Sequence, residues 1–512
     1  MRKILTITTL LLGFVLLFLA LRFHLVLLMT ESPQEYRENT FVALTDFMVV
    51  GGIPYTEEAM PAYMNVYGIA YPAIVYPFAK IFGSTYALHR IVNAFFLFLA
   101  LYVVYRVLRR ENLDRMKSLF LVVIWYTTFL LTIFDVLSRS DGFGIFLYMT
   151  TLAIPWWSKF SNKSLILAVV TTVLSFYTKQ YFVLGGIFLA LYIFLFLSKK
   201  KSLIFSAGAS CLFLTSAILI HIFMPYYFFN TILFHLKNAR YLTSHLILQI
   251  QEFSYLNFGL IFLMAMFAGW KVATIRKIQW ERFFPVPKHL FDWKKGVFQI
   301  PLNYWTVLLA FSVIVVVGKF GGHDGNFLSY FVELIGPLLI IVTALVWKQF
   351  PNKAISGLCI AGTLCILIAR TSQFGIEDKK SIDDNWTEWK GIINVCNDVY
   401  VPGPFARIAH ENGSKVYDAG HGEYFTKPIT KFMIPTFPDP RPVFNAYLHE
   451  LERKITGKEF DCIVRIKNYA SYDYLYTGHL SYFIGQNYDL IEVKPLKMYY
   501  HQSIPFEVWK RK

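Results

Sequence analysis

The chain has 512 residues, of which 56% are hydrophobic and 18% aromatic, and only 16% are charged, whereas soluble globular domains carry about 25% charged residues. This composition excludes a disordered protein, a collagen and a disulfide scaffold. A helix that spans a bilayer needs about 20 mostly apolar residues, and residues 1–370 contain one such run after another. The sequence therefore predicts a polytopic membrane protein.

The formal net charge of +16 comes entirely from residues 1–370, which hold 31 basic and 15 acidic residues. Residues 371–512 hold 18 of each and are balanced. A basic excess is one mark of a nucleic-acid partner. Here the basic residues separate apolar runs, which is how cytoplasmic loops are marked by the positive-inside rule. We therefore expect membrane lipids, and no nucleic acid, as the partner of this charge.

Eleven transmembrane spans satisfy the positive-inside rule when the N-terminus is cytoplasmic. The first span could be a signal peptide, but its apolar run is longer than a signal peptide needs and no cleavage site of small residues follows it. The cytoplasmic loops and the N-terminus then hold 21 of the 31 basic residues. The expected spans are 4–29, 86–107, 118–137, 142–157, 164–178, 181–198, 202–224, 256–274, 303–318, 331–347 and 354–370.

An odd number of spans leaves residues 371–512 outside the cell as a soluble α/β or α+β domain. We expect strands at 414–418 and 460–466 and a helix at 445–455, from their apolar patterns. Cys396 and Cys462 lie in this domain and are either a disulfide, which an oxidising compartment allows, or two buried thiols. No cysteine or histidine spacing fits a structural zinc site.

Ionisable residues outside the cytoplasmic loops gather at the outer membrane face. Such groups are costly near a bilayer and are functional candidates by default. Because five separate segments bring charge to one face, we expect a single site covered by loops. The segments are the first outer loop 30–85, then 135–141, 177–181, 225–255 and 319–333.

Lys179 and Gln180 stand between two apolar runs with almost no room for a loop. Lys179 must therefore lie at the membrane–water boundary, where it either binds an anionic head group such as a phosphate or extends to water without a ligand. Arg139 also has two possible roles. It binds a phosphate, or it forms a structural ion pair with Asp135 or Asp141.

The first outer loop supplies the carboxylates. Glu35 and Glu38 follow the first span closely, and residues 39–50 form an amphipathic helical pattern that suits the membrane interface. The glycine pair 51–52 is a helix stop, and a segment rich in Tyr and Pro follows, with Tyr67 in it. A carboxylate in such a place is either a catalytic group or solvated surface.

The order of these features resembles the GT-C glycosyltransferases, polytopic enzymes that take sugars from polyprenyl-phosphate carriers and include protein O-mannosyltransferases and the lipid A aminoarabinose transferase. The resemblance covers roughly residues 1–345. It rests on the acidic residue after the first span, the interfacial helix and the motifs that follow. These motifs are Gly51-Gly52-Ile53-Pro54-Tyr55, Phe82-Gly83-Ser84-Thr85, Ser138-Arg139-Ser140-Asp141, Tyr177-Thr178-Lys179-Gln180 and Gly321-Gly322-His323-Asp324.

The resemblance implies roles for individual residues. The family's catalytic acid lies ahead of the interfacial helix, a position taken by Glu38, with Glu35 in reserve. Lys179 and Arg139 would hold the donor phosphate, and Arg37 and Arg90 are further candidates. A divalent metal is left open, because some relatives use one. Other expected substrate-binding residues are Tyr67, Asp141, Gln180, His323, Asp324, Asn326 and Glu333.

The predicted activity is an inverting transfer of a sugar from a polyprenyl phosphate to a hydroxyl of a glycan, lipid or protein acceptor, at the outer face of a bacterial plasma membrane. The phosphate leaves as an anion and needs cations rather than a general acid, while the acceptor hydroxyl needs a carboxylate base. The alternative is a carrier that moves a lipid-linked sugar or polysaccharide without chemistry. A carrier would be expected to show paired repeats and helices broken at mid-membrane, and the sequence shows neither.

Overall fold

A computed structural model gives the fold. It describes the chain in twelve stretches, and every statement of absence below refers to these alone. They are residues 2–35, 38–132, 136–233, 241–277, 291–292, 297–298, 303–323, 328–373, 376–420, 438–467, 478–498 and 503–512.

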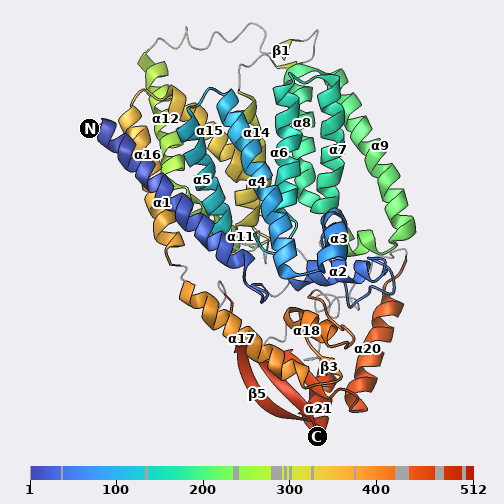
Figure 1. Cartoon of the computed structure of the whole chain (residues 1–512). Helices are drawn as coiled ribbons and strands as arrows, with labels where there is room; N and C mark the ends of the chain where they lie inside the picture. The colour runs from blue at the N-terminus through green and yellow to red at the C-terminus, as the bar shows by residue number, and fades with distance from the viewer. Residues whose placement is uncertain are drawn as a thin grey trace.

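The first 371 residues form a bundle of long helices, and the remaining residues form a smaller mixed unit at one end of it (Figure 1). Short 3-10 and π-helical turns lengthen several helices; they are η2 (Gln180–Val183), η3 (Ile193–Leu197), η4 (Phe229–Leu233), η5 (Val316–Phe320) and η6 (Phe331–Ile335). The helices of the bundle are α1 (Arg2–Leu28), α4 (Tyr86–Arg110), α5 (Arg115–Leu131), α6 (Asp141–Trp157), α7 (Asn162–Thr178), α8 (Leu184–Tyr192), α9 (Lys199–Phe223), α11 (Thr243–Leu256), α12 (Phe258–Lys277), α14 (Tyr304–Val315), α15 (Gly336–Gln349) and α16 (Lys353–Thr371).

Polar side chains in the loops between apolar runs cap the N-termini of some of these helices. The Asp114 carboxylate accepts from the backbone N–H of Met116 at the start of α5, and the Asn352 side chain accepts from Ala354 at the start of α16. Such caps satisfy donors that have no partner within the helix. The loop residues that separate the apolar runs therefore also fix where each helix starts.

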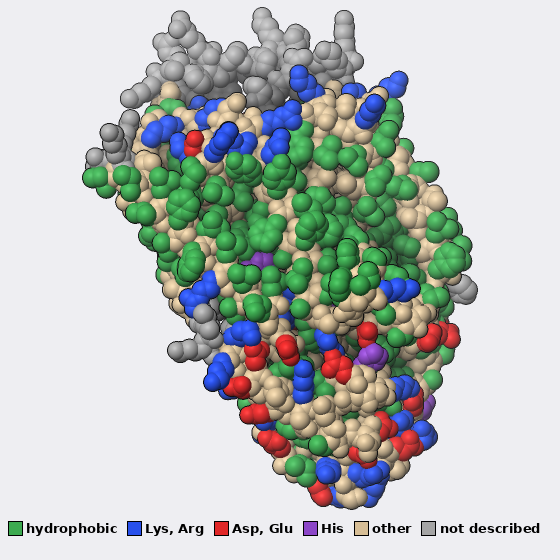
Figure 2. Space-filling view, in the orientation of Figure 1, with side chains coloured by type: hydrophobic (Ala, Val, Ile, Leu, Met, Phe, Trp, Pro, Cys, Tyr) green, Lys and Arg blue, Asp and Glu red, His purple; other side chains and the backbone are tan. Residues whose placement is uncertain are grey.

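Every one of the eleven expected spans coincides with a helix, although the number of membrane crossings remains a prediction. Among the described residues, six helices are long and apolar enough to cross a membrane, or seven if α11 and α12, which meet at an 88° bend, count as one span. An apolar band separates an end rich in Lys and Arg from an end of mixed charge (Figure 2). The apolar helices are those of an integral membrane protein.

The bundle core is built from large side chains of helices α4, α5, α6, α8, α14 and α15. Trp125 and Trp305 lie in it with almost no exposed surface. Helix α9, in contrast, has only 6% of its most apolar stretch buried. An apolar helix that packs so little against protein is one that faces lipid.

Two helices lie in the segment between α1 and α4. Helix α2 (Asn39–Val49) confirms that the expected stretch is helical, and it ends where Gly51 adopts a φ of +98° and Gly52 donates to the carbonyl of Phe47. Helix α3 (Ala70–Phe82) was not expected, because Pro72 and Pro77 lie in its sequence. Pro72 stands in the first turn, where its missing N–H costs nothing.

A four-stranded sheet organises the C-terminal unit, with strand order β3-β4-β6-β5. Strand β3 runs parallel to β4, and the other two contacts are antiparallel. The elements confirm a mixed α and β domain after the helical bundle. They are α17 (Ile376–Asn394), β3 (Val399–Tyr400), η7 (Gly403–Phe405), α18 (Ala406–Glu411), α20 (Arg441–Thr456), β4 (Cys462–Ile466), α21 (Gly478–Asn487), β5 (Tyr488–Leu496) and β6 (Ile504–Arg511); a separate pair, β1 (Phe291–Asp292) and β2 (Val297–Phe298), belongs to the bundle.

The strand expected at 460–466 and the helix expected at 445–455 are present as β4 and α20, but the strand expected at 414–418 is not formed. Just beyond that segment, the Ala419 N–H donates to the carbonyl of Ala62, between α2 and α3, over 2.8 Å. The backbone there is used to join the two parts of the chain rather than to extend the sheet. Cys396 and Cys462 form a disulfide, which settles the alternative left open by the sequence.

Candidate functional site

Glu38 is fully buried at the start of α2, beneath the loop that leaves α1. The Arg90 guanidinium of α4 donates to both of its carboxylate oxygens, each over 2.7 Å. The backbone N–H groups of Gln34 and Ser138 donate to the same two oxygens, over 2.7 and 2.9 Å. Each carboxylate oxygen of Glu38 therefore accepts two hydrogen bonds from the protein, which is about as many as it can accept.

Arg90 is equally enclosed. Besides Glu38, its terminal nitrogens donate to the backbone carbonyls of Leu27, Thr30 and Ser32, over 2.5 to 2.9 Å. Neither Arg90 nor Glu38 has exposed surface. Together they join four parts of the chain: the end of α1, α4, the segment before α6, and the loop after α1 that carries Glu31, Glu35 and Glu38, here called the acidic loop.

Burial by itself would raise the pKa of Glu38, but the charge and hydrogen bonds of Arg90 and the two backbone donors hold that pKa below its usual value. The carboxylate is therefore ionised at neutral pH. An ionised group with a lowered pKa and no accessible lone pair is a poor proton acceptor.

A second cluster lies where α6 and α7 end at the same face. Lys179, directly after α7, contacts the carboxylate of Asp141 at the start of α6 and lies 4.0 Å from Glu333. Arg139 approaches Asp141 from the other side, at 3.5 Å. These four side chains are buried or nearly so. Five segments far apart in sequence were expected to meet at one site, and these contacts bring three of them together.

Glu35 connects the acidic loop to this cluster. Its carboxylate lies 3.9 Å from the Arg139 guanidinium, a distance longer than a hydrogen bond. Glu35 retains a small exposed area, whereas Glu38 has none. The acid that the resemblance placed second is thus the one that lies beside Arg139.

Two tyrosines cover the cations. The Tyr67 ring lies 5.2 Å from the Arg139 guanidinium and 5.3 Å from the Lys179 ammonium, and its hydroxyl accepts from Arg139. Tyr181 lies 5.1 Å from Lys179 and donates its hydroxyl proton to Glu333. Such ring–cation contacts are attractive and confine the charged groups.

The approach of Gly68 to the end of α7 explains why Tyr67 reaches Lys179. The Gly68 N–H donates to the carbonyl of Thr178 over 3.2 Å, and a β-carbon at Gly68 would lie 1.8 Å from the carbonyl oxygen of Tyr177. Only glycine permits this approach.

The other expected site residues have different positions. The Gln180 side chain donates to the carbonyl of Val66 over 3.5 Å. His323 pairs with Tyr241 across an antiparallel bridge and lies near Phe320, at the edge of the region rather than within the cluster. Arg37, Asp324 and Asn326 lie outside the described residues.

Sequence reasoning missed Tyr181 and Asn93. Tyr181 stands in the Lys179 motif, so its position was a usable signal. Asn93 on α4 accepts from Gly142 N–H over 2.7 Å and donates to the carbonyl of Leu137 over 2.9 Å, which holds the Arg139 segment in place. A single asparagine in a long helix gives no such signal. Among the described residues, no group of three His, Cys, Asp or Glu side chains is arranged to hold a metal ion.

Comparison with solved structures confirms the fold. The chain is similar to the crystal structure of ArnT from Cupriavidus metallidurans in the apo state, with a TM-score of 0.53 and 9% identity over 96% of both chains. It is also similar to ArnT from the same organism bound to undecaprenyl phosphate, with a TM-score of 0.54, 10% identity, and 96% of this chain and 97% of that chain covered. ArnT is the lipid A aminoarabinose transferase and has the GT-C fold. No family model matches the sequence, and no curated protein matches it.

Proposed function

We propose that the chain is an inverting glycosyltransferase that moves a sugar from a polyprenyl-phosphate carrier to an acceptor hydroxyl at the outer face of the membrane. The observation that carries this proposal is the position of Glu35 beside Arg139, which shares the Asp141 carboxylate with Lys179. A base and two cations are the minimum set that this reaction needs. The likeness of the fold to ArnT, which has been solved with undecaprenyl phosphate bound, adds support.

The cations would stabilise the leaving phosphate. Breaking the bond between the sugar C1 and the phosphate oxygen builds oxocarbenium character on the sugar and negative charge on the phosphate. Arg139 and Lys179 are well placed to hold that charge, because Tyr67 and Asp141 restrict both side chains. Preorganised cations lower the barrier without having to rearrange during the reaction.

The longer ion pairs are the ones that a phosphate would replace. Arg139 lies 3.9 Å from Glu35, and Lys179 lies 4.0 Å from Glu333. When Arg139 turns to the phosphate, its contact with the Glu35 carboxylate is released. Donor binding would thus prepare Glu35 to take the proton of the acceptor hydroxyl as that oxygen attacks C1 from the side opposite the phosphate. Attack from that side inverts the anomeric centre.

Glu38 has a different role in this proposal. We assign it, with Arg90, to positioning the acidic loop, because its oxygens are taken up by four donors. Of the two acids that the sequence offered, we therefore propose Glu35 as the base.

We further propose that the helical bundle keeps its N-terminus in the cytoplasm of a bacterial cell and that the C-terminal unit lies outside. The basic residues at one end of the bundle support this orientation (Figure 2). The disulfide in the C-terminal unit also supports it, since disulfides persist in oxidising compartments.

The test is transfer from a radiolabelled undecaprenyl-phosphate sugar by the full-length protein in lipid nanodiscs, with bacterial envelope lipids and glycans as acceptors. We expect the wild-type protein to transfer label and Glu35→Gln to lose at least 1,000-fold in rate while binding undecaprenyl phosphate normally. Lys379→Gln, a change on the surface of α17, is the control. Full transfer by Glu35→Gln would remove Glu35 as the base, and failure of the wild-type protein to bind undecaprenyl phosphate would reject the donor class.

A further inference from the structure

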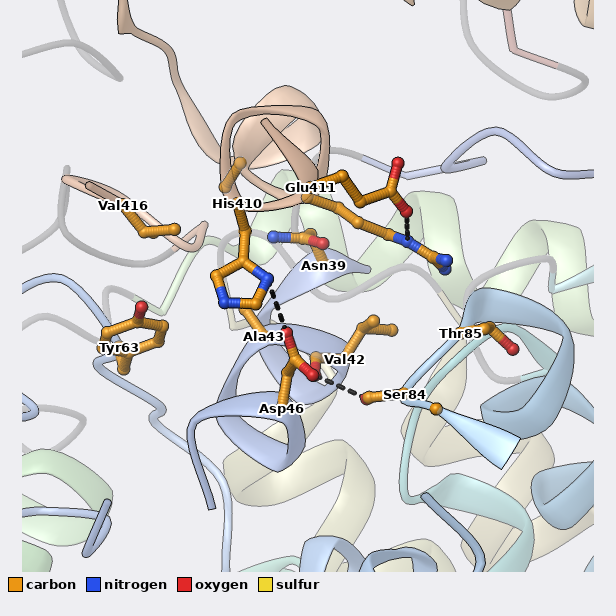
Figure 3. Close-up of a pocket in the computed structure, with 13 residues that line it drawn as sticks. Asn39, Val42, Ala43, Asp46, Tyr63, Ser84, Thr85, His410, Glu411 and Val416 are labelled. Atoms are coloured by element: carbon orange, nitrogen blue, oxygen red, sulfur yellow. Dashed lines mark hydrogen bonds and ion pairs between the residues drawn. The ribbon is translucent and has the colours of Figure 1, made fainter. Parts of the chain in front are cut away.

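Two neighbouring cavities lie between the helical bundle and the C-terminal unit, separate from the Arg139–Lys179 cluster. One has a volume of about 200 Å³ and lies between α2 and α18 (Figure 3). The other has a volume of about 310 Å³ and reaches α17. Thr85, Arg407 and Glu411 line both of them. The two cavities therefore form one continuous depression, here called the seam groove, whose size falls within the ~300–1,000 Å³ typical of small-ligand sites.

The charges along the seam groove are balanced. The first cavity places the His410 imidazole 2.8 Å from Asp46 of α2, and the two face each other in Figure 3. In the second cavity, Lys390 lies 3.4 Å from Glu31. Each of these pairs joins the C-terminal unit to the bundle. A groove in which acids and bases alternate in this way favours neither an anion nor a cation.

Arg407 and Glu411 make the centre of the groove polar. They pair through the Arg407 Nε atom at 2.7 Å, and both are partly exposed. That bond uses one of the five N–H donors of the guanidinium and one of the two carboxylate oxygens. The remaining N–H donors and the second carboxylate oxygen could bond to neighbouring hydroxyls of a ligand. The Asn39 amide and the Thr85 hydroxyl also line the wall, but they bond within the protein: Asn39 to Ala419 and Tyr86, and Thr85 to the Leu88 N–H.

From these observations we infer that the seam groove binds a neutral saccharide, the glycan part of the acceptor. Balanced charge, together with the forked donors of Arg407 and the carboxylate acceptors of Glu411, matches a ligand that carries many hydroxyls and no net charge. This inference rests on the proposed function, because it assigns to the groove the acceptor of that reaction.

The position of the groove links it to the proposed site. Glu31 lies four residues before Glu35 in the same loop, and Asn39 follows Glu38 directly. The Tyr86 hydroxyl, from the wall of the second cavity, donates to Asn39 over 2.9 Å. A saccharide in the groove would therefore lie along the outer side of the loop that carries the proposed base.

The experiment measures saccharide binding and donor binding separately, with the full-length protein in nanodiscs. A printed array of neutral, acidic and amino oligosaccharides identifies a binder, and saturation-transfer NMR with that oligosaccharide gives its affinity. Native mass spectrometry with undecaprenyl phosphate reports the donor site. We expect neutral oligosaccharides to bind, and Arg407→Ala and Glu411→Gln each to weaken that binding at least tenfold while donor binding stays unchanged.

Arg453→Ala is the matched control, because Arg453 is also an exposed arginine of the C-terminal unit that pairs with a glutamate, Glu459, but lies outside the groove. It should bind saccharide as the wild-type protein does. Glu411→Gln keeps the shape of the side chain, so it remains informative if Arg407→Ala does not fold. The inference is wrong if no neutral oligosaccharide binds, if only charged ones bind, or if both groove variants bind normally. If the wild-type protein does not bind undecaprenyl phosphate, that result would instead count against the proposed function.

Discussion

Arg90 holds the carboxylate of Glu38 through two hydrogen bonds of 2.7 Å, and neither side chain has exposed surface. The pair also gathers three carbonyls from the end of α1 and the loop after it. An arginine predicted to hold a phosphate and a glutamate predicted to be a base thus lie together beneath the loop that carries Glu35.

This arrangement predicts that Arg90→Leu destabilises the protein strongly. Removing one partner of a buried ion pair leaves an unpaired charge, at a cost of about 3–5 kcal/mol. The thermal unfolding temperature in nanodiscs should fall markedly, and restoring balance with Glu38→Gln in the same chain should recover part of the loss. If the double variant were no more stable than Arg90→Leu, the pair would not be acting as a unit.

Lys179 allows binding and stability to be separated. Lys179→Met leaves Arg139, at the longer distance, as the remaining cation beside the buried Asp141 carboxylate, so we expect both unfolding temperature and undecaprenyl-phosphate binding to fall. Adding Asp141→Asn removes the uncompensated charge. The double variant should regain stability but still bind the phosphate at least tenfold more weakly than the wild-type protein. Recovery of phosphate binding would show that Lys179 serves only to neutralise Asp141.

The fold could be predicted from the sequence further than the site could. Each of the eleven spans expected from apolar run length and loop charge coincides with a helix, because those properties are set by the membrane and act locally. Contacts across the site are not local. Glu35 and Glu38 are three residues apart in the same short segment of sequence. Their environments differ because Arg90, 52 residues beyond Glu38, binds Glu38. The strand expected at 414–418 was wrong for the same reason, since a distant partner, Ala62, takes up the backbone next to it.

The disulfide offers a test of membrane orientation. Cys396 and Cys462 are bonded, whereas Cys211, Cys359 and Cys365 are free thiols. If the C-terminal unit lies outside the cell, protein unfolded under alkylating conditions should take up three maleimide groups before reduction and five after it. Five before reduction would place this unit in a reducing compartment. In addition, Cys396→Ser should lower the stability of the C-terminal unit by about 2–5 kcal/mol.

The contact between His410 and Asp46 predicts that acid tightens the seam between the bundle and the C-terminal unit. The hydrogen bond and charge of Asp46 raise the pKa of His410 above its usual 6.5, although partial burial acts in the opposite direction. A raised pKa means that the protonated form stabilises the folded state. That stabilisation is fully present below about pH 6.5 and is lost as the pH rises through the higher pKa of the folded protein. Both side chains are partly exposed, so salt should weaken the effect.

Hydrogen exchange of the α2 and α18 amides at several pH values measures this contact directly, once intrinsic exchange rates are corrected for pH. We expect greater protection at pH 6 than at pH 8.5 in the wild-type protein and no such difference in His410→Gln. The control is His449→Gln, which removes an imidazole from α20, outside the two seam cavities, and should keep the wild-type dependence. Equal protection at both pH values in the wild-type protein would mean that the backbone bonds of Ala419, rather than the ion pair, hold the seam closed.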